Sequence, residues 1–355
     1  MKARIALVVL SCALSAVTGW VLSNRGGEPS GGPSRRAKPL IGLSLDTLKE
    51  ERWQHDRDIF VESAGKLGAD VLVQAANSDD THQIQDVQAL LSRKVDVLVV
   101  VPHNGAAMAK AVKLAHDAGV PVIAYDRLIT GADVDLYVSF DSVKVGEAQA
   151  RYLLDHLKGK KPWKIVRIHG AKTDNNALLF KQGQDNVLKP AIARGDVVVV
   201  HEDWADNWKP ENAKKIMNAA ITERGRDIDG VLAANDGTAG GAIQALIEEG
   251  LAGKVIVTGQ DAELAACQRI VAGTQAVTIY KPVKKLAAEA ADAAVKLAQG
   301  KALVAKTSVN NGKVDVPSIM LDVIPVTKDN MLDVIVKDGV HTKSEIYGAA
   351  SAPGR

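Results

Sequence analysis

Short apolar runs alternate with longer amphipathic stretches along the chain from Lys38 onward. The first run covers residues 41–45, and the stretch after it repeats apolar residues at helical spacing from Ile59 to Leu67 before Gly68 ends it. Short runs separated by helix-length stretches are typical of parallel strands joined by crossover helices. The pattern therefore predicts an α/β fold.

The apolar runs fall into two series, as expected if 355 residues form two packed lobes instead of one core. The predicted strands are 41–45, 71–74, 97–101 and 122–125 in the first series, then 136–140, and 165–168, 197–200, 231–234, 255–258 and 277–280 in the second. Two α/β sheets of similar size are expected, although no exact sequence repeat relates them. The pattern alone does not assign a last extended run, 317–326, to either sheet.

The N-terminal residues differ from the rest of the chain. A basic start followed by an apolar run from Ile5 to Leu22 predicts an export signal at residues 1–22, with an uncleaved membrane anchor as the alternative. Cys12 follows a lipobox-like sequence, which leaves lipidation open. Residues 23–38 are rich in Gly, Pro, Ser and Arg and are predicted to be a flexible linker.

Charge and cysteine content narrow the class of protein. The net charge is +2 with acids and bases interspersed, so no basic face is available for phosphates and no nucleic-acid partner is expected. The two cysteines are Cys12 and Cys267, and removal of the signal would leave one. An internal disulfide is then impossible, and the core must supply the stability.

Motifs for nucleotide, nucleophile and metal chemistry are missing from the sequence. No G-x-x-x-x-G-K-[ST] loop is present, residues 236–241 do not fit G-x-G-x-x-G, and residues 42–44 lack the second glycine of a nucleophile elbow. The eight histidines are scattered without an H-E-x-x-H motif, and no calcium loop is found. We therefore expect no enzyme activity, no cofactor and no metal.

Polar residues follow most of the predicted strands, where ligands of open parallel sheets bind. They are Asp46, Glu51, Arg52, Trp53, Asp126 and Arg127 in the first half, and Asn175, Asn176, Trp204, Trp208, Asn235, Asp236, Gln260, Asp261 and Lys281 in the second. Carboxylates and amides facing guanidinium and ammonium donors can satisfy a ring of hydroxyl groups. A tryptophan from each half could sandwich a pyranose ring through its C–H faces. The sequence thus favours a neutral polyol in a cleft between two lobes.

Each of these residues also has a structural interpretation. Asp174 and Asn235 are suited to cap helices, Trp204 and Trp208 at i, i+4 could form one packed face, and the Asp-Arg pair at 126–127 could be a solvated turn. These interpretations do not explain why such residues recur at strand ends in both halves.

Several motifs occur together in one order along the chain. They are Glu51-Arg52-Trp53-Gln54, Ala124-Tyr125-Asp126-Arg127, Asp174-Asn175-Asn176-Ala177, Asn235-Asp236, Gly259-Gln260-Asp261-Ala262 and Tyr280-Lys281-Pro282. With them the chain resembles the periplasmic sugar-binding proteins of type I fold, and within that family the xylose-binding proteins of ABC transport systems. The resemblance extends from about Leu40 to about Glu345.

The resemblance implies a set of sugar-binding residues that agrees with the strand-end residues. They are Arg52, Trp53, Asp126, Arg127, Asn176, Trp208, Asn235, Asp261 and Lys281. One position departs from some relatives, because Lys181 stands where an arginine is expected, so no sugar contact is assigned to it.

The resemblance also implies two Rossmann-like lobes with parallel sheets, joined by a hinge of three chain crossings near Asp141, Pro282 and Val316. The expected lobes are 39–141 plus 283–316 and 142–282 plus 317–345, and the expected disordered tail is 346–355.

The implied function is capture of a monosaccharide, D-xylose first, in the periplasm and its delivery to an ABC-type permease, with tethering through the N-terminus left open. The alternative is a sugar-sensing receptor for a chemoreceptor or sensor kinase. A transcription repressor of this fold would need a helix-turn-helix ahead of the first lobe, where residues 1–37 hold an apolar signal and a linker. An enzyme would need a placed nucleophile or a cofactor loop, and neither is found.

Overall fold

The predicted alternation of strands and helices begins at Leu40 in the computed structural model, which describes residues 38–348. The export signal or anchor at 1–22, Cys12, the linker up to residue 37 and the end of the predicted tail from 349 lie outside the described residues. Within 38–348, no helix has both the length and the apolar character needed to cross a bilayer.

The first lobe is built on a seven-stranded sheet of order β11-β12-β5-β4-β3-β1-β2. Its strands are β1 (Leu40–Leu45), β2 (Asp70–Ala75), β3 (Val97–Val100), β4 (Val122–Tyr125), β5 (Leu136–Phe140), β11 (Thr307–Asn310) and β12 (Asp315–Leu321). All neighbours pair in parallel except β11, which is antiparallel to β12 at the edge.

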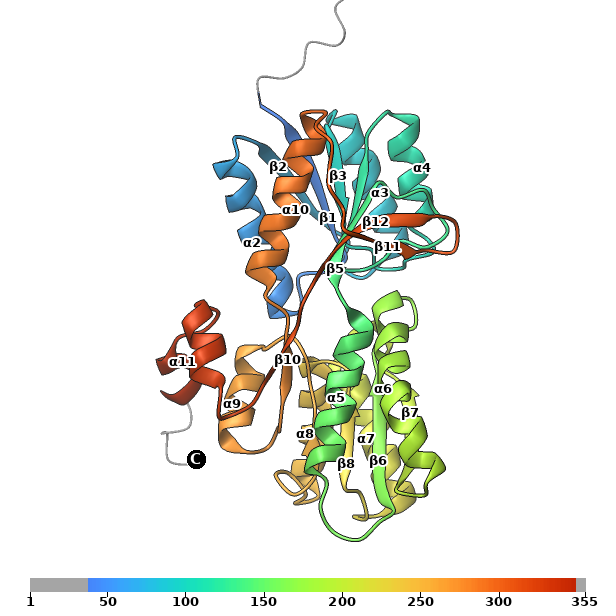
Figure 1. Ribbon diagram of the computed structural model, residues 1–355, viewed down its shortest axis with the longest axis vertical. Coiled ribbons are helices and arrows are strands. Elements are labelled where there is room, and N and C mark those ends of the chain that lie inside the picture. Colours follow the sequence, from blue (N-terminus) through green and yellow to red (C-terminus); the bar gives the residue numbers. More distant parts are fainter. Residues whose placement is uncertain (1–37, 349–355) are drawn as a thin grey trace, which may run out of the picture. The chain divides into compact units, whose positions relative to one another are not determined.

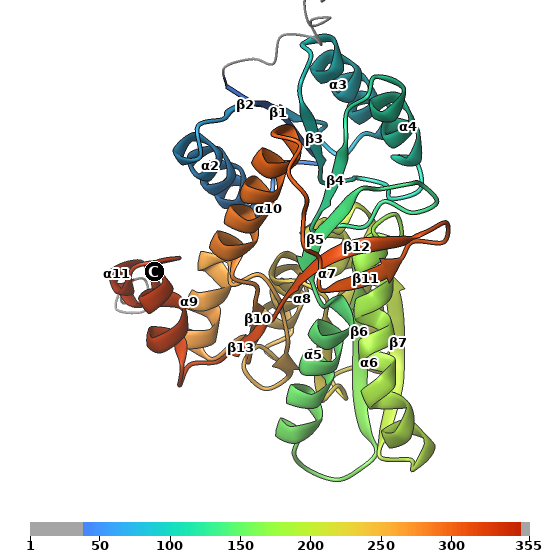
Figure 2. The ribbon, with the colours of Figure 1, turned by 45° about the horizontal axis from the view of Figure 1, so that its top comes forward.

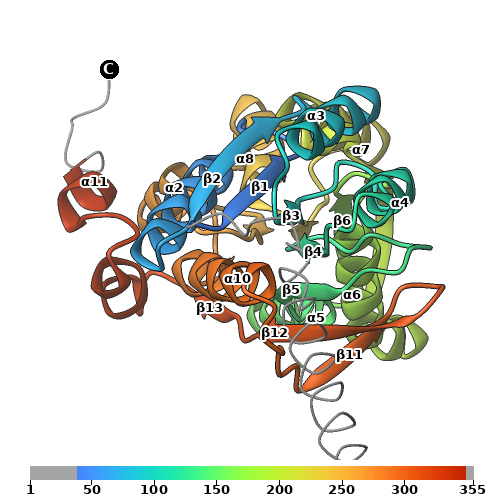
Figure 3. The ribbon, with the colours of Figure 1, turned by 90° about the horizontal axis from the view of Figure 1, so that it is seen from above.

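Helices cover both faces of this sheet, and each face has its own core (Figures 1 and 3). The helices are α2 (Glu51–Lys66) and α10 (Val283–Ala298) on one face, and α3 (Asp80–Ser92) and α4 (Ala109–Asp117) on the other. Leu43 packs in the core of α2 and α10, whereas Leu98 of β3 packs in the opposite core. Burial on both faces explains why these strands are continuous apolar runs.

The second lobe has a four-stranded parallel sheet of order β7-β6-β8-β9. Its strands are β6 (Trp163–His169), β7 (Val197–Trp204), β8 (Gly230–Ala233) and β9 (Ile256–Val257). β10 (Thr278–Tyr280) and β13 (Ile324–Val326) form a separate antiparallel ladder, which one isolated parallel bridge, Gln260 to Ile279, connects to the end of β9. The expected second sheet of similar size is thus divided in two.

Helices also flank the second sheet. They are α5 (Ser142–His156), α6 (Asn175–Ala193), α7 (Pro210–Arg224) and α8 (Asp236–Glu248), followed by α9 (Leu264–Ala272) and α11 (Lys343–Gly348), with a short 3-10 turn, η1, at Asp206–Trp208 and a π-helical stretch, η2, at Leu332–Val336. Leu153 of α5 and Leu188 of α6 share one core, and Met217 of α7 and Leu246 of α8 share another.

The chain crosses between the lobes three times, and the third crossing lies further along than predicted (Figure 2). The first two lie at Asp141, between β5 and α5, and at 281–282, between β10 and α10. The predicted boundary at 316/317 is wrong, because residues 318–321 of β12 pair with β5 in the first lobe. The third crossing is therefore the two-residue link 322–323 between β12 and β13.

The predicted tail also begins too early. α11 continues to Gly348, and Ile346 is fully buried in a core that contains Tyr280 and Ile335. Residues 346–348 therefore belong to the folded second lobe.

Candidate functional site

One cavity lies where the strand ends of the two lobes meet, and all nine predicted sugar-binding residues line it. The space that it encloses, open solvent at its edge included, is about 330 Å³. Its lining is Glu50, Arg52, Trp53, Asp126, Arg127, Asp174, Asn176, Phe180, Trp208, Asn235, Gln260, Asp261 and Lys281. Residues from α2, from the loop after β4 and from the ends of the second-lobe strands are thus brought together.

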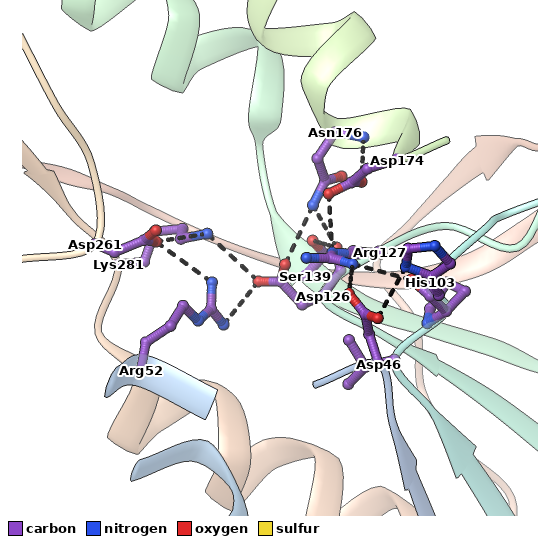
Figure 4. A network of polar contacts seen from close by, with 12 residues as sticks. Asp46, Arg52, His103, Asp126, Arg127, Ser139, Asp174, Asn176, Asp261 and Lys281 are labelled. Carbon is purple, nitrogen blue, oxygen red and sulfur yellow. Dashed lines mark hydrogen bonds and ion pairs between the residues drawn. The ribbon is translucent and has the colours of Figure 1, made fainter. Parts of the chain in front are cut away.

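Four charged residues form a closed square of ion pairs at one side of the cavity (Figure 4). Arg52 Nη2 lies 3.0 Å from Asp126 Oδ2, and its Nη1 lies 3.5 Å from Asp261 Oδ1. Lys281 Nζ lies 3.0 Å from Asp261 Oδ1 and 3.6 Å from Asp126 Oδ2. Burial alone would raise the pKa of Asp126, but Arg52 and Lys281 lower it to about 2. The square therefore carries two positive and two negative charges.

Arg127 forms a second group of ion pairs, shown at the other side of Figure 4. Its Nη1 lies 2.6 Å from Asp46 Oδ2, and its Nε lies 2.8 Å from Asp174 Oδ2. Asp46 in turn lies 2.9 Å from Nδ1 of His103. Burial lowers the pKa of Arg127, but Asp174 and Asp46 outweigh it and raise the pKa above the usual range. Arg127 is thus held as a cation by one carboxylate from each lobe.

Asp126 is fixed by its backbone as well as by its charge. Its φ is +60°, a region that L-residues rarely adopt. Its carbonyl oxygen accepts hydrogen bonds from Tyr137 Oη at 2.9 Å, Ser139 Oγ at 2.5 Å and Asn176 Nδ2 at 3.0 Å. Asn176 belongs to the second lobe, so this amide joins the lobes at the same carbonyl.

Two further lining residues share this backbone conformation: Trp208 has φ +57° and Asp261 has φ +99°. Strained backbone of this kind occurs at functional sites, where the surrounding structure holds it in place. Three of the nine predicted residues are therefore presented by backbone with positive φ, which non-glycine residues rarely adopt.

The two tryptophans in the cavity differ in their surroundings. Trp53 is 3% exposed, and the guanidinium carbons of Arg52 and Arg127 lie 4.1 and 5.2 Å from its ring centroid. Trp208 packs edge-on against Phe180 at 6.3 Å. Both rings line the cavity, so each is available to a ligand, and each is also part of a packed wall. Trp204 ends β7, packs on His169 and does not line the cavity, but it also packs against the hydrophobic cluster that contains Trp208. The packed interpretation therefore holds for Trp204, whereas Trp208 is both packed and part of the cavity wall.

Four buried polar atoms of lining residues have no hydrogen-bond partner among the residues that the structure describes. They are Glu50 Oε2, Asp126 Oδ2, Trp208 Nε1 and Gln260 Oε1. Burying such atoms costs free energy unless something bonds them. Asp126 Oδ2 has its ion pairs with Arg52 and Lys281, and the other three atoms have no partner of either kind. Acceptors and a donor lining one cavity are complementary to a ligand rich in hydroxyl groups.

The helix-cap interpretation is correct for two residues, and it coexists with a place in the cavity. Asp174 Oδ1 accepts from Asn176 N at 2.9 Å, while its Oδ2 pairs with Arg127. Asn235 Oδ1 accepts from Thr238 N at 2.8 Å in a capping box. Capping therefore does not argue against a role in the site.

The predicted set of nine binding residues leaves out four lining residues: Glu50, Asp174, Phe180 and Gln260. Gln260 was among the strand-end residues, and Asp174 was interpreted only as a helix cap, whereas the sequence reasoning selected neither Glu50 nor Phe180. Glu51, which the sequence singled out, instead accepts a hydrogen bond from Leu264 N at 3.0 Å outside this cavity. Three other strand-end residues do not line the cavity: Asp46, Asn175 and Asp236.

Comparison with known proteins gives close relatives. The chain is 48% identical over 315 residues to the D-xylose-binding periplasmic protein of Haemophilus influenzae, covering 88% of this chain and 94% of that protein. It is 49% identical over 306 residues to the protein of the same name in Escherichia coli K12, covering 86% and 92%. A solved carbohydrate transporter solute-binding protein from Chloroflexus aurantiacus, in complex with D-glucose, superposes with a TM-score of 0.81 at 36% identity, covering 86% of this chain and 97% of that one.

A family comparison agrees with these relatives. The family described as periplasmic binding protein domain matches residues 41–302, which span both lobes and all nine predicted binding residues. The chain belongs to the periplasmic binding protein family.

Proposed function

We propose that this protein is a periplasmic solute-binding protein that captures a monosaccharide, D-xylose first, between its lobes and delivers it to an ABC-type permease. The observation that carries the proposal is a cavity lined by three buried polar atoms that have neither a hydrogen bond nor an ion pair among the described residues: the acceptors Glu50 Oε2 and Gln260 Oε1 and the donor Trp208 Nε1. The names and identities of the two xylose-binding relatives support the choice of sugar.

The nine predicted residues bind the sugar. The carboxylates of Asp126 and Asp261 accept from sugar hydroxyls, and Arg52, Arg127 and Lys281 donate to sugar oxygens. Their charges balance closely, which suits a neutral ligand and disfavours a strongly anionic one. Charge-assisted hydrogen bonds in such a buried site contribute roughly 1.5–3 kcal/mol each.

Sugar binding is expected to stabilise the closed arrangement of the lobes, because the site draws on both. A ligand shifts such an equilibrium only through contacts that differ between the two states. No bond is made or broken in this function, and we assign no catalytic residue.

A receptor role is the less favoured alternative. The multiple sugar-binding periplasmic receptor ChvE of Rhizobium radiobacter is 32% identical over 327 residues, well below the identity of the xylose-binding proteins. Transport is therefore the function that we propose.

Thermal-shift and calorimetric titration of the purified protein against xylose, ribose, arabinose, glucose and galactose tests the proposal. Xylose is expected to raise the melting temperature selectively, since saturation at 100 times Kd stabilises a protein by about 2.7 kcal/mol. A protein that responds to none of these sugars would refute it.

A further inference from the structure

Glu50 is a cavity residue that neither the sequence motifs nor the proposed binding set includes. Its carboxyl lines the cavity beside Arg127, and its Oε2 is buried with no hydrogen bond or ion pair among the described residues. Asp126 Oδ2 also lacks a hydrogen bond, but it has the ion pairs with Arg52 and Lys281. Glu50 Oε2 is thus the carboxylate oxygen of the site that a ligand would have to satisfy.

Apart from a hydrogen bond to its own backbone, the Glu50 side chain has no structural role that the local structure shows. Glu50 is the N-cap residue of α2, yet its side chain makes no capping hydrogen bond. The adjacent Glu51 behaves differently, because its carboxylate accepts from Leu264 N and lies near His55 and His341. One of two neighbouring glutamates therefore bonds to the second lobe, and the other faces the cavity.

The electrostatic surroundings make this placement unfavourable on its own. Burial raises the pKa of Glu50, Arg127 opposes that shift, and the like charges of Asp46 and Asp261 add to it. A buried carboxyl without a partner costs stability, and local costs of this kind concentrate at functional sites. Ionised or protonated, a carboxyl can pair with a hydroxyl, which both donates and accepts.

Glu50 also stands at the outer end of the cavity. A wider space of about 1250 Å³, which includes open solvent, adjoins it, and of residues 38–348 only Glu50 and Trp208 line both. A group bonded to Glu50 is therefore the part of the ligand nearest the mouth of the cleft.

We propose that Glu50 is a specificity-determining residue that hydrogen-bonds one hydroxyl of the bound aldose at the end of the ring facing the cleft mouth. This inference rests on the proposed function and adds a residue to it.

Calorimetric titration of the wild-type protein and of Glu50→Ala with xylose and its 2-, 3- and 4-deoxy analogues and 1,5-anhydroxylitol tests the inference. Glu50→Ala is expected to weaken xylose binding roughly 10- to 100-fold. One analogue lacks the hydroxyl that Glu50 bonds, and the wild type and Glu50→Ala should bind that analogue with equal affinity. Removing the carboxyl costs nothing there, because its hydroxyl partner is already missing from the sugar. Glu50→Gln should show a smaller loss with the same analogue.

Lys49→Ala is the matched control. Lys49 is exposed, and it lines the wider outer space but not the cavity. This variant should bind xylose as the wild type does. Wild-type affinity in Glu50→Ala, or equal losses for xylose and all four analogues, would overturn the inference while leaving the proposed function intact. A wild-type protein that binds no sugar would refute the proposed function, and the inference with it.

Discussion

Arg127 of the first lobe and Asp174 of the second form an ion pair, with Nε 2.8 Å from Oδ2 and both side chains at most 6% exposed. Asp174 also caps α6, so one carboxylate both starts a helix and links the lobes. Removing one partner of a buried pair leaves an uncompensated charge, which costs far more than the pair itself contributes.

Asp174→Ala is therefore expected to lower the free energy of unfolding by about 3–5 kcal/mol, measured by urea denaturation. Asp79→Ala is the control for capping alone, because Asp79 accepts from His82 N at 2.7 Å at an exposed helix start without a buried cation. That change should cost about 1 kcal/mol. Equal losses in the two variants would contradict a role for the ion pair.

Asp261→Asn is expected to weaken xylose binding roughly 10- to 100-fold, because it removes a carboxylate that faces both Arg52 and Lys281. Asparagine tolerates positive φ better than most residues, so the backbone at +99° should persist. Calorimetric titration measures the change, and Asp292→Asn, at a surface pair with Lys296, is the control. Unchanged affinity would remove Asp261 from the binding set.

Gly170→Ala tests how Trp208 is positioned. A Cβ at Gly170 would lie 2.0 Å from the Trp208 ring, so the ring must move away. Xylose affinity and the tryptophan fluorescence change on binding should both decrease. Gly65→Ala in α2, where a Cβ meets nothing within 4 Å, should leave affinity unchanged and stabilise the helix by up to about 1 kcal/mol. Full affinity in Gly170→Ala would show that the position of Trp208 is not important for binding.

Glu263 gives the protein a pH dependence of stability. Burial, together with the charges of Asp236 and Asp261, raises its pKa from 4.5 to about 9. Between these values the unfolded chain loses the proton and the folded chain keeps it, so stability should fall as pH rises from about 5 to 9. Urea denaturation across this range should show a weaker decline in Glu263→Gln than in the wild type.

The matched control for this pH dependence is Glu248→Gln, because Glu248 pairs with Lys214 at the surface. It should retain the wild-type decline. A Glu263→Gln profile parallel to that of the wild type would contradict the assignment.

Much of the fold could be predicted because burial on both faces makes strands continuous apolar runs. The third crossing could not be predicted, because residues 317–326 read as one extended run, although β12 and β13 within it belong to different sheets. Sheet membership depends on pairing with β5 and β10, which lie far away in the sequence. No residue pattern within the run indicates that the chain passes from one lobe to the other at 322–323.

The nine binding candidates all belong to the longer list of residues that follow strands whose ends meet, and the resemblance to the sugar-binding proteins selected them from that list. Glu50 could not be found in this way, because Glu50 and Glu51 are the same residue type. The position at which α2 begins decides which of the two side chains lines the cavity. Asp174 was interpreted as a cap, which is correct but incomplete. The positive φ of Trp208 and Asp261 could not be predicted either, because neither residue is a glycine, the residue type that usually marks such backbone in a sequence.

The late position of the third crossing has a consequence for synthesis of the chain. The first lobe is not complete until β12 is made, and the second needs Ile346 for its core. A chain growing from its N-terminus thus holds two unfinished domains until nearly all of it has emerged, although domains generally fold as units. A chain truncated after Pro282 should be digested by protease at the rate of an unfolded polypeptide. Split lobes would in this way delay the folding of both domains until synthesis of the chain is almost finished.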